Sequence, residues 1–204
     1  MPYCMKRIKA VRDFRLSSKR TSTNKLADTP TRFQTENMPT GTYVVIPEVS
    51  SEKRKYIPMG YMDDTVLCSN KVRIMSNATL YHFGILESNV HMAWMRVVCG
   101  RLKSDYDYSI KIVYNNFPWP MHNEAQKEKI EQTAQGILDA RALYPDCSLA
   151  ALYDEVTMPP ELRKAHQAND RAVMQAYGFW GKLNTETACV AELMKMYQKL
   201  TERG

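Results

Sequence analysis

Residues 100–108 read Gly-Arg-Leu-Lys-Ser-Asp-Tyr-Asp-Tyr, which alternates charged side chains with mostly apolar or aromatic ones. In a β-strand, side chains point alternately to opposite faces, so an extended stretch places four charged residues on one face: Arg101, Lys103, Asp105 and Asp107. Such a row suits the DNA major groove, where lysine and arginine pair with guanine and a carboxylate accepts a hydrogen bond from cytosine. The alternative is a solvated strand edge whose charges prevent aggregation. The pattern alone favours this alternative.

The length and composition are those of a globular protein. The chain has 204 residues, 44% of them hydrophobic and 25% charged, which is enough for one large domain or two small ones. Its apolar runs are too short for a membrane-spanning helix or a secretory signal, so we expect a cytoplasmic protein. Five cysteines without a CxxC pair, and histidines without partners at ligand spacing, predict neither a disulfide framework nor a metal site.

The positive charge is concentrated in the first part of the chain. Residues 1–120 contain 18 lysines and arginines against 10 acidic residues, whereas residues 121–204 contain 10 against 12. A basic module followed by a nearly neutral one is typical of phosphate-backbone binding by the first part. Binding to a membrane surface is disfavoured, because it needs basic residues beside a strongly apolar helix face.

The first 42 residues predict one helix followed by loops. Residues 7–16 have the pattern of a short amphipathic helix, with three apolar side chains facing inward: Ile8, Val11 and Phe14. Residues 17–25 mix Lys19 and Arg20 with hydroxyl side chains, which suits contacts to DNA phosphates as well as it suits a solvated loop. Residues 28–42 are rich in turn-forming residues and are predicted to be a surface loop.

Short β-branched or aromatic runs predict a small mixed sheet. The strands are expected at residues 43–46, 56–59, 66–68 and 72–75. Between the first two lies the basic segment 50–55, where three consecutive cations are candidates for contacts to the DNA backbone: Lys53, Arg54 and Lys55. The alternative for this segment is a solvated hairpin loop.

A helix is predicted over residues 89–99, with Gly100 ending it. Its inward stripe places Trp94 in the core rather than on a stacking surface, together with three valines: Val90, Val97 and Val98. His82 and His91 are interpreted as structural or surface histidines.

Helical spacing dominates after residue 120. Asn123 and Gln126 fit a capping box, and further helices are expected from Pro159-Pro160 and over residues 185–200, forming a small bundle. His166 and Asn169 lie on the apolar stripe of the second helix, where they form either a polar network or, as we favour, partly exposed packing. The predicted fold class is therefore α+β, with a strand-containing domain at residues 1–120 and a helical domain at residues 121–204.

Catalytic motifs are missing from the sequence. No two glycines are separated by one residue, no Asp-x-Lys or Glu-x-Lys pair occurs, and neither His-Glu-x-x-His nor Gly-x-Ser-x-Gly is present. Residues 116–119 read Asn-Phe-Pro-Trp, which differs from the Asn-Pro-Pro-aromatic motif of adenine methyltransferases. We predict no catalytic residue and no cofactor in this chain.

Several longer segments carry a resemblance to a known family. In order, they are VSSEKRKYIPMG at 49–60, NATLYHFGIL at 77–86, HMAWMR at 91–96, GRLKSD at 100–105, VYNNFPWP at 113–120 and MPPELRKAH at 158–166. From about Arg7 to its end, the chain resembles the C-terminal part of MmeI-like enzymes, which are single-chain restriction-modification proteins that methylate adenine at N6. The resemblance implies a target-recognition domain followed by a helical domain, without the nuclease and methyltransferase parts that precede them.

The resemblance implies that double-stranded DNA and a methyltransferase domain are the partners, and that S-adenosylmethionine belongs to the missing domain. It favours base readout by Arg101, Lys103, Asp105 and Asp107, because family members vary at the positions matching Lys103 and Asp105 within a similar Gly-Arg-Leu frame. Asp107 departs from the family, in which arginine is more usual. Tyr106 and Tyr108, which alternate with the charged residues, are expected to pack inward. The alternative is a truncated structural or interaction remnant that docks on a separate methyltransferase chain.

Overall fold

The computed structural model describes residues 1–34, 36 and 39–202, and it divides the chain into two compact units at residue 38. The first unit contains α1 (Pro2–Leu16), α2 (Thr21–Asn24) and the 3-10 helix η1 (Lys25–Asp28). Arg15 joins them, because its guanidinium Nη1 donates to the carbonyl oxygens of Leu26 at 2.9 Å and Thr29 at 2.8 Å.

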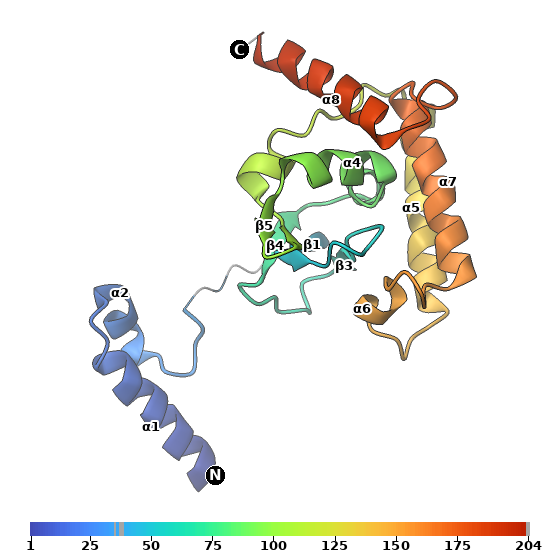
Figure 1. The fold of residues 1–204 in the computed structure, drawn as a ribbon. Coiled ribbons are helices and arrows are strands. Elements are labelled where there is room, and N and C mark those ends of the chain that lie inside the picture. Colours follow the sequence, from blue (N-terminus) through green and yellow to red (C-terminus); the bar gives the residue numbers. More distant parts are fainter. Residues whose placement is uncertain (35, 37–38, 203–204) are drawn as a thin grey trace. The chain divides into compact units, whose positions relative to one another are not determined.

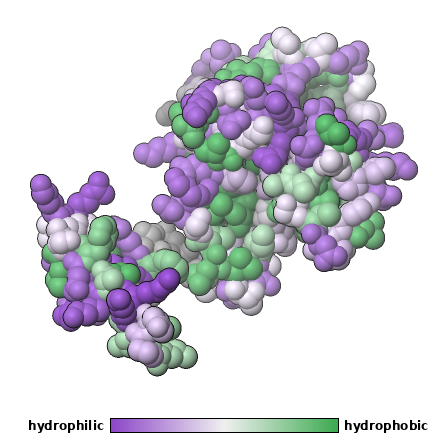
Figure 2. Space-filling model, turned by 60° about the horizontal axis from the view of Figure 1, so that its bottom comes forward, coloured by the Kyte–Doolittle hydropathy of each residue, from purple (hydrophilic) through white to green (hydrophobic). Residues whose placement is uncertain are grey.

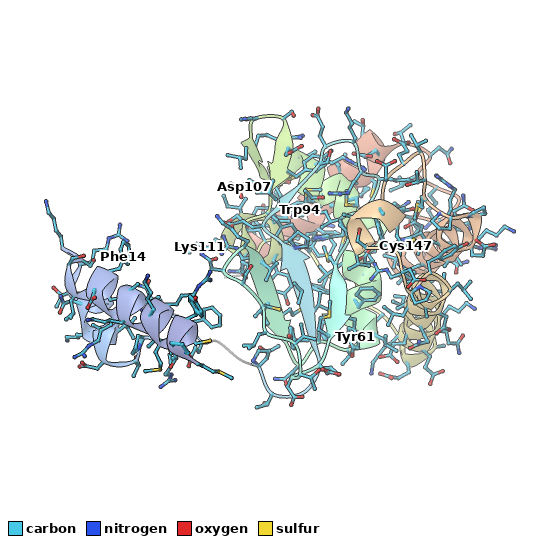
Figure 3. All side chains as sticks on the ribbon, turned by 90° about the horizontal axis from the view of Figure 1, so that it is seen from below. Phe14, Tyr61, Trp94, Asp107, Lys111 and Cys147 are labelled. Carbon is cyan, nitrogen blue, oxygen red and sulfur yellow. The ribbon has the colours of Figure 1, made fainter. Side chains whose placement is uncertain are left out.

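Two expectations for this unit are wrong. Segment 17–25, predicted to be a loop, contains helical turns. The predicted helix starts earlier, at Pro2, and buries none of its residues; Phe14 is 74% exposed (Figure 3). The helix was expected to contact the rest of the unit through apolar side chains. It does so instead through the polar side chain of Arg15. The predicted loop at 28–42 lies partly outside the described residues.

The strands form two small antiparallel sheets rather than one mixed sheet. The first has the order β3–β1–β4, from Gly60–Met62, Tyr43–Pro47 and Val72–Ser76. The second has the order β2–β6–β5, from Val49–Ser50, Asp105–Asp107 and Gly100–Leu102. The α+β class is confirmed, as are strands at 43–46 and 72–75.

Segments 56–59 and 66–68 are not strands. The backbone groups of Met59 bond to side chains from distant segments instead of a neighbouring strand. Its N–H donates to Oε1 of Glu87, the residue after α3, at 2.9 Å, and its carbonyl accepts from Nη1 of Arg141 at 2.7 Å. The carbonyl of Val66 accepts a hydrogen bond from the Tyr43 hydroxyl. Side chains from other elements therefore satisfy groups that the predicted ladders needed.

The helices of the second unit follow the expected caps. They are α3 (Leu80–Leu86), α4 (Asn89–Val98), the π-helical turn η2 (Ile110–Tyr114), α5 (Glu124–Ala142), α6 (Leu149–Leu152), α7 (Pro160–Ala176) and α8 (Glu186–Thr201). The capping box of Asn123 and Gln126 is confirmed. Two details of α4 were wrong, because Val97 is 57% exposed and Gly100 begins β5 instead of ending the helix.

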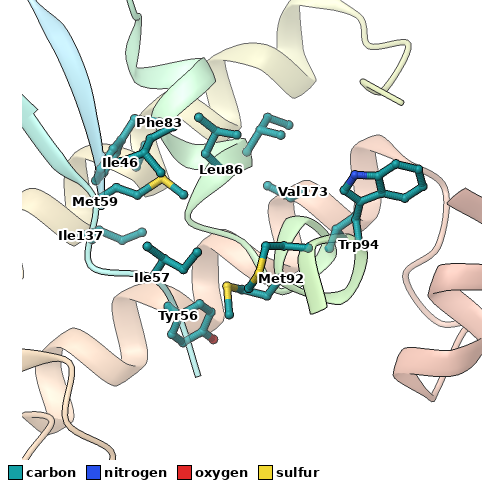
Figure 4. Packing of buried hydrophobic residues seen from close by; sticks show 14 of the residues in the cluster. Ile46, Tyr56, Ile57, Met59, Phe83, Leu86, Met92, Trp94, Ile137 and Val173 are labelled. Atoms are coloured by element: carbon teal, nitrogen blue, oxygen red, sulfur yellow. The ribbon is translucent and has the colours of Figure 1, made fainter. Parts of the chain in front are cut away.

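One hydrophobic cluster runs through the strands and the helices of the second unit. Ile46 and Met59 come from the strand-containing part, Phe83 from α3, and Ile137 and Val173 from α5 and α7 (Figure 4). In Figure 1, α5 and α7 lie side by side, and α8 packs against α4. Among the described helices, none is both long and apolar enough to cross a membrane. The helical part therefore shares its core with the strands.

Candidate nucleic-acid interface

Residues 100–108 fold as a hairpin and not as the single extended strand that we predicted. Strands β5 and β6 pair with Gly100 opposite Asp107, Arg101 opposite Tyr106 and Leu102 opposite Asp105. Lys103 and Ser104 form the turn between them, and Lys103 adopts a φ of 58°. A positive φ is usual in two-residue hairpin turns, because it matches the twist of the strands. The alternation read from the sequence therefore stops at Lys103.

The hairpin separates the four predicted readers. Directly opposed residues of antiparallel strands share a face, so Asp105 and Asp107 lie on one face, together with Leu102. Arg101 lies on the other face with Tyr106, and its guanidinium is 4.2 Å from the centre of that ring. The same guanidinium donates to the Ser104 carbonyl at 3.0 Å. The predicted common face for Arg101 and the two aspartates is wrong.

The base of the hairpin is anchored in the core, as predicted for its two tyrosines. Tyr106 and Tyr108 are both buried. Tyr108 shares a hydrogen bond of 3.0 Å with Nε2 of His91 on α4. Burial lowers the pKa of His91 to about 3, so this imidazole is neutral near pH 7. The structural role predicted for His91 is confirmed. Asp107 lies on β6, in the sheet that this contact supports (Figure 3).

The three cations Lys53, Arg54 and Lys55 lie in a turn beside the hairpin, which we call the basic loop (residues 51–55). Strand β2, which precedes this loop, pairs with β6. The Glu52 N–H donates to Asp105 Oδ1 at 3.4 Å, and the Tyr106 hydroxyl donates to the Glu52 carbonyl at 3.4 Å. The fold thus brings two segments about fifty residues apart in sequence into one polar surface.

Two family models together match residues 1–203 of the chain. Residues 1–121 match the family model of the MmeI target recognition domain, and residues 122–203 match that of the MmeI C-terminal domain. The chain belongs to the MmeI family.

Two relatives describe this family further. DNA methyltransferase A of Bacillus subtilis (strain 168) is 40% identical over 202 residues, which is 99% of this chain and 23% of that protein. A solved structure of the Type IIL restriction-modification enzyme MmeI in complex with DNA matches with a TM-score of 0.90 at 48% identity. That match covers 99% of this chain and 27% of the MmeI chain. The present chain therefore spans about a quarter of each relative.

The other two candidates, Lys19 and Arg20, lie in the first unit of this MmeI-family chain, where both are exposed. Residues 1–38 contain nine lysines and arginines against three acidic residues, whereas residues 39–204 contain nineteen of each. The entire net charge of +6 thus comes from the first unit. The first unit is the smaller body in Figure 2, where hydrophilic side chains lie next to hydrophobic ones on its surface.

A buried polar cluster connects the two MmeI domains, and three of its members, Glu87, Arg141 and Tyr153, were not identified in the sequence. Arg141 on α5 donates to Glu87 Oε1 at 2.8 Å and to the hydroxyl of Tyr153. Tyr153 in turn shares a hydrogen bond of 2.7 Å with His166 Nε2, and His166 Nδ1 lies 3.2 Å from the Glu87 carbonyl oxygen. Asn169 donates to the Gly84 carbonyl at 2.7 Å. Because His166 and Asn169 are fully buried, the network alternative was right and the partly exposed packing was wrong.

The charges in this cluster are strongly affected by burial. Burial raises the pKa of Glu87 to about 7, although the Arg141 guanidinium acts in the opposite direction. Burial, together with the positive charge of Arg141, lowers the pKa of His166 to about 3. A sequence signal existed, because Arg141 continues the i, i+4, i+7 spacing of Ile130, Ala134 and Ile137 on the buried face of α5. The cluster thus joins the two family domains through buried hydrogen bonds.

Proposed function

We propose that this chain selects the DNA sequence on which an MmeI-type adenine methyltransferase acts. Residues 1–120 would contact the DNA and residues 121–204 would support them. The observation that carries this proposal is the surface made by the exposed hairpin tip and the basic loop beside it, in a chain of the MmeI target-recognition family. A two-stranded ribbon of this width fits the major groove of B-DNA.

Lys103 and Asp105 are the proposed readers of one G·C base pair. Lys103 is exposed in the turn, where its ammonium group is free to donate to guanine O6 or N7. Asp105 starts the returning strand, and its carboxylate is suited to accept from the N4 amine of the paired cytosine. Asp107 lies on the same face and would meet a neighbouring pair. Arg101, stacked on Tyr106, would reach the DNA from the opposite face of the hairpin.

Lysines and arginines outside the hairpin are proposed to contact phosphates. Among the described residues, no salt bridge involves Lys53, Arg54 or Lys55, so their charges are not neutralised within the chain. Lys19 and Arg20 would add contacts from the first unit. Such contacts fix the register of a protein on DNA and strengthen binding without specifying bases.

Catalysis is proposed to come from a methyltransferase domain outside this chain, in the same polypeptide or in a separate one. S-adenosylmethionine would bind there, and the complex would act on DNA in the cytoplasm. The competing function is protein docking, for which residues 1–38 offer exposed aromatic side chains on α1: Tyr3 is 83% exposed and Phe14 74%. A gel shift with random-sequence duplex DNA at two salt concentrations separates the two functions, because only DNA binding gives a salt-dependent shift.

Exchanging the two readers tests the proposal. Lys103→Glu combined with Asp105→Arg reverses both charges, so the preferred pair should change from G·C to C·G at one position. The original site should lose about 1 to 3 kcal/mol of binding free energy. The measurement is selection from a randomised duplex library, with the methyltransferase part supplied by fusion or mixing.

The matched control exchanges an exposed ion pair on α5, Glu124→Lys with Lys127→Glu, whose side chains lie 3.6 Å apart. It reverses the same number of charges far from the hairpin in sequence, and it should leave the selected site unchanged. If the reader exchange also leaves every position of the selected site unchanged, Lys103 and Asp105 are not readers, and the hairpin is only a charged sheet edge.

A further inference from the structure

At the end of the basic loop, the buried side chain of Tyr56 contacts the helical C-terminal domain. We propose that Tyr56 and Asp170 are positioning residues: their hydrogen bond fixes the basic loop in the orientation that contacts DNA phosphates. This inference rests on the proposed function, because it assumes that the loop binds DNA. It assigns to the C-terminal domain a direct part in DNA affinity.

Tyr56 directly follows the last cation of the loop and is 2% exposed. Its hydroxyl donates to Asp170 Oδ2 on α7 at 2.6 Å. Its ring stacks on His166, with 4.1 Å between ring centres and 22° between planes. Asp170 Oδ1 accepts from the N–H of Asn89, the first residue of α4, at 2.7 Å. One carboxylate thus ties the end of the loop to two helices.

The backbone of the loop end is held separately. The carbonyl of Lys55 accepts a hydrogen bond of 3.1 Å from Arg96 Nη2 on α4. Arg96 also forms a 2.7 Å ion pair with Glu186 at the start of α8. Since Glu52 at the other end bonds to Asp105 and Tyr106, the loop is fixed at both ends. Lys53 and Arg54 lie between these two anchors.

The chemistry of the Tyr56 contact distinguishes a positioning role from simple packing. A phenylalanine would fill the same space and stack on His166 without requiring a buried carboxylate nearby. Burying Asp170 is unfavourable, and burial raises the pKa of Asp170 to about 6 even though hydrogen bonds from Tyr56 and Asn89 oppose the shift. A hydrogen bond has a directional preference that apolar packing lacks, so it defines the course of the chain into the basic loop.

The test compares Tyr56→Phe and Asp170→Asn with the matched control Tyr144→Phe. Tyr144 also donates to a helix carboxylate, Glu161 at 2.8 Å, but on the surface and away from the basic loop in sequence. Binding of each full chain to random-sequence duplex DNA is measured over a range of salt concentrations. Hydrogen exchange of the amides in residues 52–55 is measured in the same proteins.

Tyr56→Phe should weaken binding about three- to tenfold for all sequences, a decrease of up to about 1.4 kcal/mol. The slope of log affinity against log salt should become shallower by about 0.9 for each phosphate that the loop no longer neutralises. Exchange should accelerate in the loop and stay unchanged in β6 and α4. Asp170→Asn should act in the same direction, and Tyr144→Phe should change neither quantity.

Three results would overturn the proposal. The first is unchanged affinity and salt slope in Tyr56→Phe, and the second is unchanged exchange in the loop. The third is accelerated exchange throughout the second unit, which would make Tyr56 a general stability residue. If the unmodified chain does not bind duplex DNA at any salt concentration, the proposed function itself fails; loop exchange would still report whether Tyr56 orders the loop.

Discussion

Arg141→Met should strongly destabilise the second unit. Arg141 donates hydrogen bonds to the Met59 carbonyl at 2.7 Å, to Glu87 Oε1 at 2.8 Å and to the Tyr153 hydroxyl, and its side chain is 8% exposed. Methionine matches much of the volume but has no donor. Each buried acceptor left without a partner costs about 1 to 3 kcal/mol. Removing one member of a buried ion pair costs about 3 to 5 kcal/mol.

Protonation of Glu87 limits this cost, because its pKa is already raised to about 7. We therefore expect the free energy of unfolding to fall by about 3 to 5 kcal/mol, a large part of the ~5 to 15 kcal/mol typical of a domain. The assay is urea unfolding, followed by the circular dichroism of the helices and by the fluorescence of tryptophans that include the buried Trp94.

The control is Arg73→Met, which removes a 2.8 Å ion pair to Glu48 in which both side chains are partly exposed. Such pairs contribute about 0 to 1 kcal/mol. Because Arg141 and Tyr153 lie in one family domain and Met59 and Glu87 in the other, both probes should follow a single transition. A destabilisation as small as that of the control, or separate transitions for the two probes in the unmodified chain, would refute the joint role of this cluster.

Four further outcomes are expected. Gly84→Ala should lower the free energy of unfolding by about 1 to 3 kcal/mol, because the added Cβ would lie 2.8 Å from Ile130 Cγ2. Gly136→Ala is the control: its Cβ would have nothing within 4 Å, so the better helix propensity of alanine should raise the free energy of unfolding by about 0.5 to 1 kcal/mol. Thermal unfolding measures both. Burial lowers the pKa of His91 to about 3 in the folded chain, against the ordinary value of 6.5 that applies to the unfolded chain. Between pH 6.5 and pH 3 only the unfolded chain therefore protonates this imidazole, and the folded state loses stability as the pH falls below 6.5. His91→Gln should flatten that decline by about 1.4 kcal/mol per pH unit in urea titrations at several pH values. Reversing the charges of Lys53, Arg54 and Lys55 should weaken binding equally for all sequences and reduce the salt slope by about 0.9 for each phosphate no longer neutralised; a change in base preference would instead make them readers. Calorimetry should show no binding of S-adenosylmethionine to the isolated chain, and stoichiometric binding would contradict this expectation.

The candidate DNA-contact residues were selected in the sequence by their side-chain chemistry, but the period of two did not place them on the correct faces. The residues 100–108 were identified as an exposed charged stretch, and the inward positions of Tyr106 and Tyr108 are confirmed. The left-handed conformation of Lys103 has no signature in its residue type, because lysine rarely adopts it. Without that turn, period-two counting placed Arg101 on the wrong face.

Across the whole fold, features set by contacts close in sequence were predictable, and features set by distant contacts were not. The start of α5 at Asn123 was readable, because the capping side chain bonds to the backbone N–H of Gln126, only three residues away. The course of residues 56–59 was not readable, since their hydrogen-bond partners are Glu87, Arg141 and Asp170, between 28 and 114 residues away.

The sequence by itself determined the family, the α+β class and the chemical types at the DNA-contact candidates, since these depend on residue identity and short-range spacing. Only the tertiary structure decided which of those residues share a surface. Strand β2 brings the basic loop beside the hairpin, and Tyr56 ties that loop to α7. Such pairings depend on how buried polar groups find partners across the folded chain, and no local pattern encodes that choice.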